Sequence, residues 1–279
     1  MNQPFFLKPG FIEGEKGTLF AIHHEPVIKA DRNECVVVLS AFAEEMNRCR
    51  YMQNMLAQAL NKQGYGLICV DPYGTGDSAG EFADADWNGW VSDSITAIHY
   101  AAELGYNKIS LLGIRLGALL ALAAMPSVNN VSHLLLWQPV YNGKATLTQF
   151  LRLKIAAAMA RGEDGITTAQ LEDEINQGSS IQIAGYDVSP GLFKGIQQAH
   201  INHHFDAIPA SVSWFTVLPS ADKKAPRADL QTIEKWRSKG VQINHQNIVG
   251  PAFWQAHERT LAPDLVPATL AAVIGGEAP

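Results

Sequence analysis

The sequence predicts an α/β fold, with a mostly parallel central sheet, helices on both of its faces and an inserted helical cap. Continuous apolar runs such as 34–42 and 66–74 are typical of strands that are buried on both faces of a sheet. Stretches with helical periodicity alternate with these runs at short spacing. This alternation indicates strand–helix–strand units with parallel strands.

The expected elements follow one another in a regular order. The first half should contain two strands around a glycine-rich turn (5–26), a strand (34–42), a helix (48–65), a strand (66–74), a helix (86–105), a strand (108–113), a helix (116–125) and a strand (131–140). After an interruption, the pattern returns with a strand (210–219), a helix (228–240), a strand (241–250) and a last helix near 265–276.

The interruption defines the expected domain organisation. Residues 143–205 contain three helical stretches and no convincing strand. We therefore expect a core made of residues 1–142 and 206–279, with a helical cap formed by residues 143–205. The cap would enter the core between two strands of the sheet.

Composition excludes several classes of function. The 279 residues carry a net charge of −6, which argues against a nucleic-acid-binding surface rich in lysine and arginine. There is no basic amphipathic helix, no leader-like start and no apolar run of roughly 20 residues, so we expect no membrane insertion. Three scattered cysteines, Cys35, Cys49 and Cys69, are expected to be buried reduced thiols, which favours a cytoplasmic protein.

The turn after strand 108–113 carries the main functional signal. Gly113 and Gly117 have the spacing of a G-x-S-x-G nucleophile elbow, but Arg115 stands where the serine would be. A guanidinium stays protonated and cannot attack a substrate. At a helix N-terminus it could bind a carboxylate or phosphate. The alternative is an ion pair with Glu44 or Glu45, and the two roles are compatible.

The segment 41–47 follows another buried strand and should lie at the same edge of the sheet. In a hydrolase, such a loop donates one N–H to the oxyanion, here from Ala43 or Glu44, and Leu116 would donate the other. The adjacent acids Glu44 and Glu45 are unusual for a simple turn. The alternative is a solvated loop whose acids balance neighbouring arginines.

An acid and a base are expected after the later strands. Asp222 follows strand 210–219, and His257 follows the last strand, which gives the chain order of a serine, acid and histidine triad without its serine. His257 could equally be an ordinary surface histidine. Trp254 and Asn47 are expected to line the pocket, although Trp254 could instead fill the core.

Three further patterns in the sequence are not favoured as functional sites. Ser78 satisfies G-x-S-x-G literally, but no apolar helix follows it at once. The glycines of 74–80 resemble a dinucleotide loop whose helix comes too late, so we predict no cofactor. Three histidines in the cap have zinc-like spacing, but a polar helix face is the preferred interpretation and no metal is predicted: His200, His203 and His204.

Several motifs together resemble a known group: AFAEEMNRCRYM, DPYGTGDSAGEF, GIRLGALLAL, FLRLKIAAAMARG and GPAFWQAHE. Over nearly the whole chain the pattern resembles the α/β-hydrolase superfamily, and more narrowly the exosortase A system-associated hydrolase 2 family. The resemblance implies a bacterial protein associated with the exosortase and PEP-CTERM sorting system. It also implies that arginine is common at this elbow. Where the family has an acid after the FW segment, this chain has His257 and Glu258.

Three functions remain open. The first is hydrolysis of an ester, thioester or similar acyl bond, with water activated by Glu44, Glu45 or His257 and the oxyanion held by Leu116 and Arg115. The second is a non-catalytic pseudo-hydrolase that binds a small anionic ligand. The third is a partner-binding scaffold in envelope or polysaccharide biogenesis. Whether the chain is an enzyme, and whether it forms a homo-oligomer, is left open by the sequence.

Overall fold

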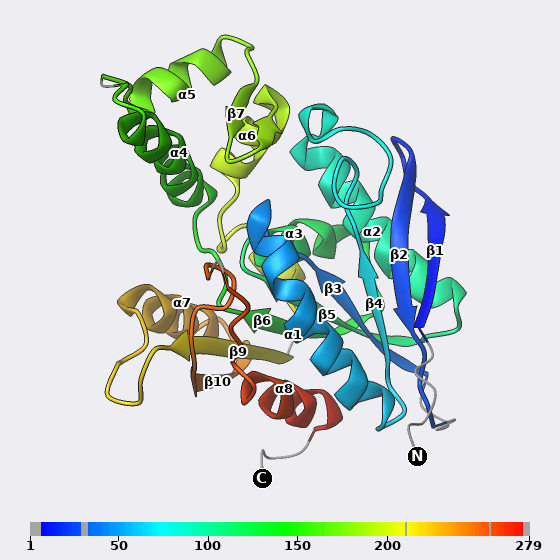
Figure 1. Ribbon diagram of the computed structural model, residues 1–279. Coiled ribbons are helices and arrows are strands. Elements are labelled where there is room, and N and C mark those ends of the chain that lie inside the picture. Colours follow the sequence, from blue (N-terminus) through cyan, green and yellow to red (C-terminus); the bar gives the residue numbers. More distant parts are fainter. Residues whose placement is uncertain (1–6, 29–32, 164, 210, 257, 276–279) are drawn as a thin grey trace.

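The computed structural model describes residues 7–28, 33–163, 165–209, 211–256 and 258–275 (Figure 1). Its main sheet has eight strands: β1 (Leu7–Glu13), β2 (Thr18–His24), β3 (Glu34–Leu39), β4 (Gly66–Val70), β5 (Lys108–Ile114), β6 (Val131–Trp137), β9 (Ser211–Leu218) and β10 (Gln242–Val249). Their order is β1-β2-β4-β3-β5-β6-β9-β10. The strands from β4 to β10 in this order run parallel to one another. Strand β2 runs antiparallel to β4, and β1 runs antiparallel to β2. This is the mostly parallel sheet that the sequence predicts.

Helices cover both faces of this sheet. Successive residues of β3 point to opposite sides, so Val37 belongs to the buried cluster that includes residues of α2 (Trp87–Glu103), α3 (Gly117–Ala124) and α7 (Arg227–Arg237). Val38 belongs instead to the buried cluster on the other face, which includes residues of α1 (Glu44–Asn61) and α8 (Leu265–Ile274). Both valines are fully buried, and burial of each contributes about 1.5–3 kcal/mol. The β-branched runs are therefore explained by burial on both faces.

The segment between β6 and β9, residues 143–205, is called the insert below. It contains α4 (Gly143–Ala160), α5 (Thr168–Asn176), the hairpin of β7 (Ile181–Ile183) and β8 (Tyr186–Val188), and α6 (Pro190–Gln198). In Figure 1 these elements gather apart from the sheet, at the upper left. The prediction that this segment has no strand was wrong. Strands of three residues are too short for alternation to reveal.

The chain enters and leaves the insert side by side. The N–H of Gly143 donates to the carbonyl oxygen of Ala199 (3.0 Å), and the N–H of Ile201 donates to that of Tyr141 (2.8 Å). Short 3₁₀ helices complete the described elements: η1 (Phe82–Asp84), η2 (Met125–Ser127) and η3 (Phe205–Ala207).

Two boundaries differ from the prediction in ways that affect the site. Helix α1 begins at Glu44, so Glu44, Glu45 and Asn47 belong to a first helical turn and not to a loop. Acids are favourable there because they face the positive end of the helix dipole. Helix α6 ends at Gln198, so the three cap histidines do not share a helix face. His204 has a positive φ of 54°.

Two other sequence expectations concern the described residues. The thiols of Cys35, Cys49 and Cys69 are buried and free, as predicted. Within the described parts of the chain, no helix is both long enough and apolar enough to cross a membrane.

Candidate functional site

A sharp turn joins β5 to α3 at the centre of the sheet. Its middle residue, Arg115, has a φ of 54°, a conformation that is uncommon for a residue with a side chain. Both flanking glycines are required by close packing. A Cβ on Gly113 would lie 2.6 Å from the Cα of Ala118, and a Cβ on Gly117 would lie 2.0 Å from the carbonyl oxygen of Leu39. The turn thus has the strand–turn–helix form that the glycine spacing predicts.

Each nitrogen of the Arg115 guanidinium donates a hydrogen bond. Its Nε and Nη2 donate to the two carboxylate oxygens of Glu45 at 3.2 and 3.3 Å, and its Nη1 donates to the Gln138 carbonyl oxygen at 3.2 Å. The Cζ atom lies 5.0 Å from the ring centre of Trp254, in a cation–π contact. The ion pair considered from the sequence is therefore present, and Glu45 is its partner. We call Arg115, Glu45, Gln138 and Trp254 the Arg115 cluster.

Gln138 is a member of this cluster that the sequence analysis missed. It follows β6 with a φ of 42°. Its N–H donates to the Phe215 carbonyl oxygen (2.9 Å), and its Oε1 accepts from the N–H of Val217 (2.7 Å). These bonds tie the ends of β6 and β9 together and orient the carbonyl that Arg115 binds. A glutamine before a proline carries no pattern that announces a positive φ.

A cavity of about 510 Å³, the hairpin pocket, lies between the carboxyl ends of β3 and β4 and the β7–β8 turn. Its apolar wall consists of Met46, Phe82, Trp90 and Leu120. Ala43 and Asn47 also line it, whereas Arg115 and Trp254 do not. Among the described residues that line the pocket, the charged side chains are the acids Asp77 and Glu81, which disfavours an anionic ligand.

Glu44 and Glu45 bind different neighbouring side chains. The Tyr186 hydroxyl in the hairpin donates to Glu44 Oε2 at 3.0 Å. Burial, and then the hydrogen bond with Glu44, raise the pKa of Tyr186 to about 12, so the phenol keeps its proton near neutral pH. Glu44 also lies 3.8 Å from Arg48. Glu44 therefore joins the insert to the core, whereas Glu45 neutralises Arg115.

The two expected oxyanion donors lie at the starts of helices. Ala43 precedes α1 with a φ of 52° and a ψ of −129°, and Leu116 precedes α3. Neither backbone N–H donates a hydrogen bond to another of the described residues. Both groups are thus available to bind a carbonyl oxygen.

The expected acid, Asp222, is not brought to the Arg115 cluster. Asp222 is exposed on the loop after β9, where it accepts from the Ser220 hydroxyl (2.6 Å) and lies 3.8 Å from the ammonium of Lys223. His257 lies outside the described residues. No group of three or more histidines, cysteines or acids in the described chain is arranged to hold a metal ion.

Ser78 lines the hairpin pocket but has a structural role. Its hydroxyl donates to the Asp71 carbonyl oxygen (2.5 Å) and accepts from the N–H of Phe20 (2.8 Å). These bonds fix the loop after β4 against β2. A serine nucleophile needs a base within hydrogen-bond reach, and the hydroxyl has no histidine partner among the described residues.

Comparisons with known proteins agree with this fold. The family model described as serine aminopeptidase, S33, matches residues 30–172. No curated protein matches. Among solved structures, Est1E from Butyrivibrio proteoclasticus with bound ferulic acid is 17% identical, with a TM-score of 0.65 over 95% of this chain and 99% of that one. A highly thermostable carboxyl esterase from Bacillus coagulans is 12% identical, with a TM-score of 0.67 over 96% and 98%. At these identities the likeness shows a shared α/β-hydrolase fold.

Proposed function

The chain belongs to the serine aminopeptidase S33 family of α/β hydrolases, and we propose that it binds an uncharged acyl compound without forming an acyl-serine intermediate. The observation that carries this proposal is the engagement of Arg115. It occupies the middle of the β5–α3 turn, and Glu45 and Gln138 bind its guanidinium. No nucleophile is offered at this position. The chain would therefore retain an acyl ligand instead of turning it over.

The hairpin pocket supports the choice of ligand. Its wall contains aromatic and aliphatic side chains that suit an apolar acyl chain, and its charged lining residues are the acids Asp77 and Glu81. The N–H of Ala43, which lines the pocket, and that of Leu116, the residue after Arg115, donate to no other described residue and suit the oxygen of a carbonyl group. An anionic ligand at Arg115, the other possibility raised by the sequence, would compete with Glu45 for the guanidinium.

Hydrolysis without a covalent intermediate is the second candidate, favoured by the position of Glu44 beside the hairpin pocket. Glu44 would remove a proton from water as the water attacks the acyl carbon, and the two backbone N–H groups would stabilise the oxyanion. Glu44 would then return the proton to the leaving group as the bond to the acyl carbon breaks. Base catalysis of this kind contributes roughly 10²–10⁴-fold. The contact between Glu44 and Tyr186 would keep the carboxylate at the pocket edge.

Two measurements test the proposal. Fluorophosphonate treatment of the folded protein should leave no serine adduct by mass spectrometry, and an adduct on Ser78 would refute the proposal. N-butyl butyramide should raise the melting temperature, while its anionic counterpart butyrate should not. Measurable hydrolysis of p-nitrophenyl butyrate that disappears in Glu44→Gln but persists in the matched control Glu103→Gln, at an exposed acid at the end of α2, would establish the second candidate instead.

We also propose that residues 143–205 form a cap on a core of residues 1–142 and 206–279. The contact of Tyr186 with Glu44, and a hydrogen bond from the Ser189 hydroxyl to the Ala85 carbonyl oxygen (2.5 Å), support a fixed cap. Membership of the exosortase A system-associated subfamily and a cytoplasmic location are proposals that rest on the sequence motifs and composition.

A further inference from the structure

Three aromatic side chains from separate elements line the hairpin pocket. Phe82 lies on η1, Trp90 lies on α2, and Tyr186 lies on the β7–β8 hairpin of the insert. The ring centre of Phe82 lies 5.8 Å from that of Trp90 and 5.0 Å from that of Tyr186, and both pairs meet edge to face. These three rings therefore form one continuous surface, which we call the aromatic wall.

Hydrogen bonds fix the two outer rings of the aromatic wall. Nε1 of Trp90 donates to the Tyr73 carbonyl oxygen at 3.0 Å. The Tyr186 hydroxyl is held by Glu44, as described above. The polar atoms of both side chains are thus already bonded to the protein, and the carbon surface of the rings is left for a ligand.

Packing fixes the central ring. Phe42, which does not line the pocket, has its ring centre 6.0 Å from that of Phe82 and 6.1 Å from that of Trp90. Phe82 itself is only half-buried, so part of its ring remains accessible from the pocket. Because the aromatic wall is formed before a ligand binds, little side-chain ordering opposes binding.

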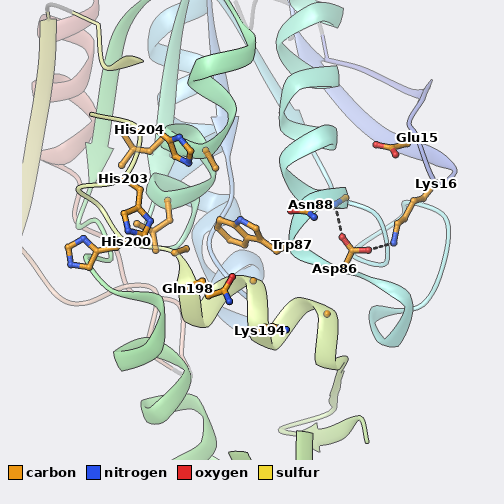
Figure 2. A pocket seen from close by; sticks show the side chains of 17 residues that line it. Glu15, Lys16, Asp86, Trp87, Asn88, Lys194, Gln198, His200, His203 and His204 are labelled. Atoms are coloured by element: carbon orange, nitrogen blue, oxygen red, sulfur yellow. Dashed lines mark hydrogen bonds and ion pairs between the residues drawn. The ribbon is translucent and has the colours of Figure 1, made fainter. Parts of the chain in front are cut away.

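A second cavity, of about 590 Å³, lies where α6 and the segment after it meet the start of α2, and its lining is different (Figure 2). Among the described residues that line it, Trp87 is the only one with a phenyl, phenol or indole ring. Figure 2 shows polar side chains on either side of this indole, with His203 on one side and Asp86 on the other. Of these two cavities, only the hairpin pocket has a wall of several aromatic rings.

We propose that the acyl compound bound in the hairpin pocket carries an aromatic ring, as a phenylpropanoic amide or ester does. An aromatic ligand gains edge-to-face or stacked contacts with the aromatic wall in addition to the burial of its surface, whereas an alkyl ligand gains only the burial. The thioether of Met46, which also lines the pocket, makes favourable contacts with aromatic rings as well. This inference rests on the proposed function, because it names the class of acyl group that the same pocket binds.

Isothermal titration of the full chain with 3-phenylpropionamide and 3-cyclohexylpropionamide tests the inference. The two amides share the carbonyl group, the chain length and the ring size. The cyclohexyl compound is the more hydrophobic of the two, so burial alone predicts that it binds at least as tightly. With two ring contacts to the aromatic wall, the phenyl compound should instead bind about tenfold more tightly.

A pair of matched variants locates this preference. Phe82→Leu keeps an apolar side chain but removes the central ring, and it should reduce the preference for the phenyl compound to about threefold or less. Phe11→Leu removes an exposed ring of β1 outside the pocket and should leave the preference unchanged. Each preference compares two ligands on the same protein, so a change in stability cancels.

Three results would overturn the inference. The first is a cyclohexyl compound that binds as tightly as the phenyl compound, which leaves the proposed function standing. The second is an equal preference in Phe82→Leu and Phe11→Leu, which would mean that the aromatic contact lies elsewhere, as at Trp87 in the second cavity. The third is the absence of saturable binding of both amides in the millimolar range. If N-butyl butyramide still raises the melting temperature in that case, only the inference fails; if it does not, the proposed function fails as well.

Discussion

The coupling between Arg115 and Glu45 can be measured with a double-mutant cycle of Arg115→Met, Glu45→Gln and the double variant. The two charges meet through paired hydrogen bonds of 3.2 and 3.3 Å, and the side chains are 14% and 24% exposed. At an effective dielectric constant of 20, two charges about 4 Å apart attract by about 4 kcal/mol. Desolvation, side-chain ordering and solvent screening reduce this figure, so we expect a coupling energy of about 1–2 kcal/mol.

Urea unfolding of the four proteins gives this coupling energy directly. The contacts of Arg115 with Gln138 and Trp254 are lost in both proteins that lack the arginine, so they cancel in the cycle. The coupling should shrink when the salt concentration is raised to about 1 M, because salt screens partly exposed charges.

A coupling energy below about 0.5 kcal/mol would refute the reasoning. Arg115 would then exchange Glu45 for an external carboxylate or phosphate at little cost, and an anion-binding role for the turn would be favoured. An expected coupling accompanied by saturable binding of acetate at Arg115 would also contradict a guanidinium that is already occupied.

Three further predictions concern the scaffold. Burial raises the pKa of Asp229 to about 7, above its value of about 4 in the unfolded chain, so the unfolding free energy falls as pH rises from about 4 to 7. Asp229→Asn should remove about 2 kcal/mol of this decline between pH 5 and 8. An unchanged pH profile would count against this reasoning. Gly117→Ala should destabilise the fold by more than 2 kcal/mol, because its Cβ would clash with Leu39; a melting temperature equal to wild type would contradict the turn geometry. Ser78→Ala should lower the unfolding free energy by about 1–2 kcal/mol, without changing any ester hydrolysis.

The sequence predicted the sheet and its helices because buried strands and amphipathic helices leave strong periodic patterns. The start of α1 was missed because Ala43 provides no side-chain cap, so no serine, threonine or acid marks the boundary. The short hairpin left too few residues to show alternation. Where the strands were long, as in β3, the order of elements was predicted correctly.

The candidate site was only partly predictable. The glycines at 113 and 117 predicted the turn, because the spacing itself reflects close packing. The sequence could not choose between Glu44 and Glu45 as the partner of Arg115. Neighbouring residues on a helix point in directions about 100° apart, and only the orientation of α1 decides which of them faces the turn. The role of Gln138 depends on a backbone angle that has no sequence pattern.

Hydrogen bonds between Tyr141–Gly143 and Ala199–Ile201 hold the two ends of the insert side by side, which makes the insert a replaceable module. Strands β6 and β9 are neighbours in the sheet, so the core needs no particular length of chain between the two ends of the insert. The insert can therefore be lengthened, shortened or exchanged without changing the strand order. Gly185 and Tyr186 of the insert line the hairpin pocket, so the lining of that pocket can change with this segment while the turn that holds Arg115 stays unchanged.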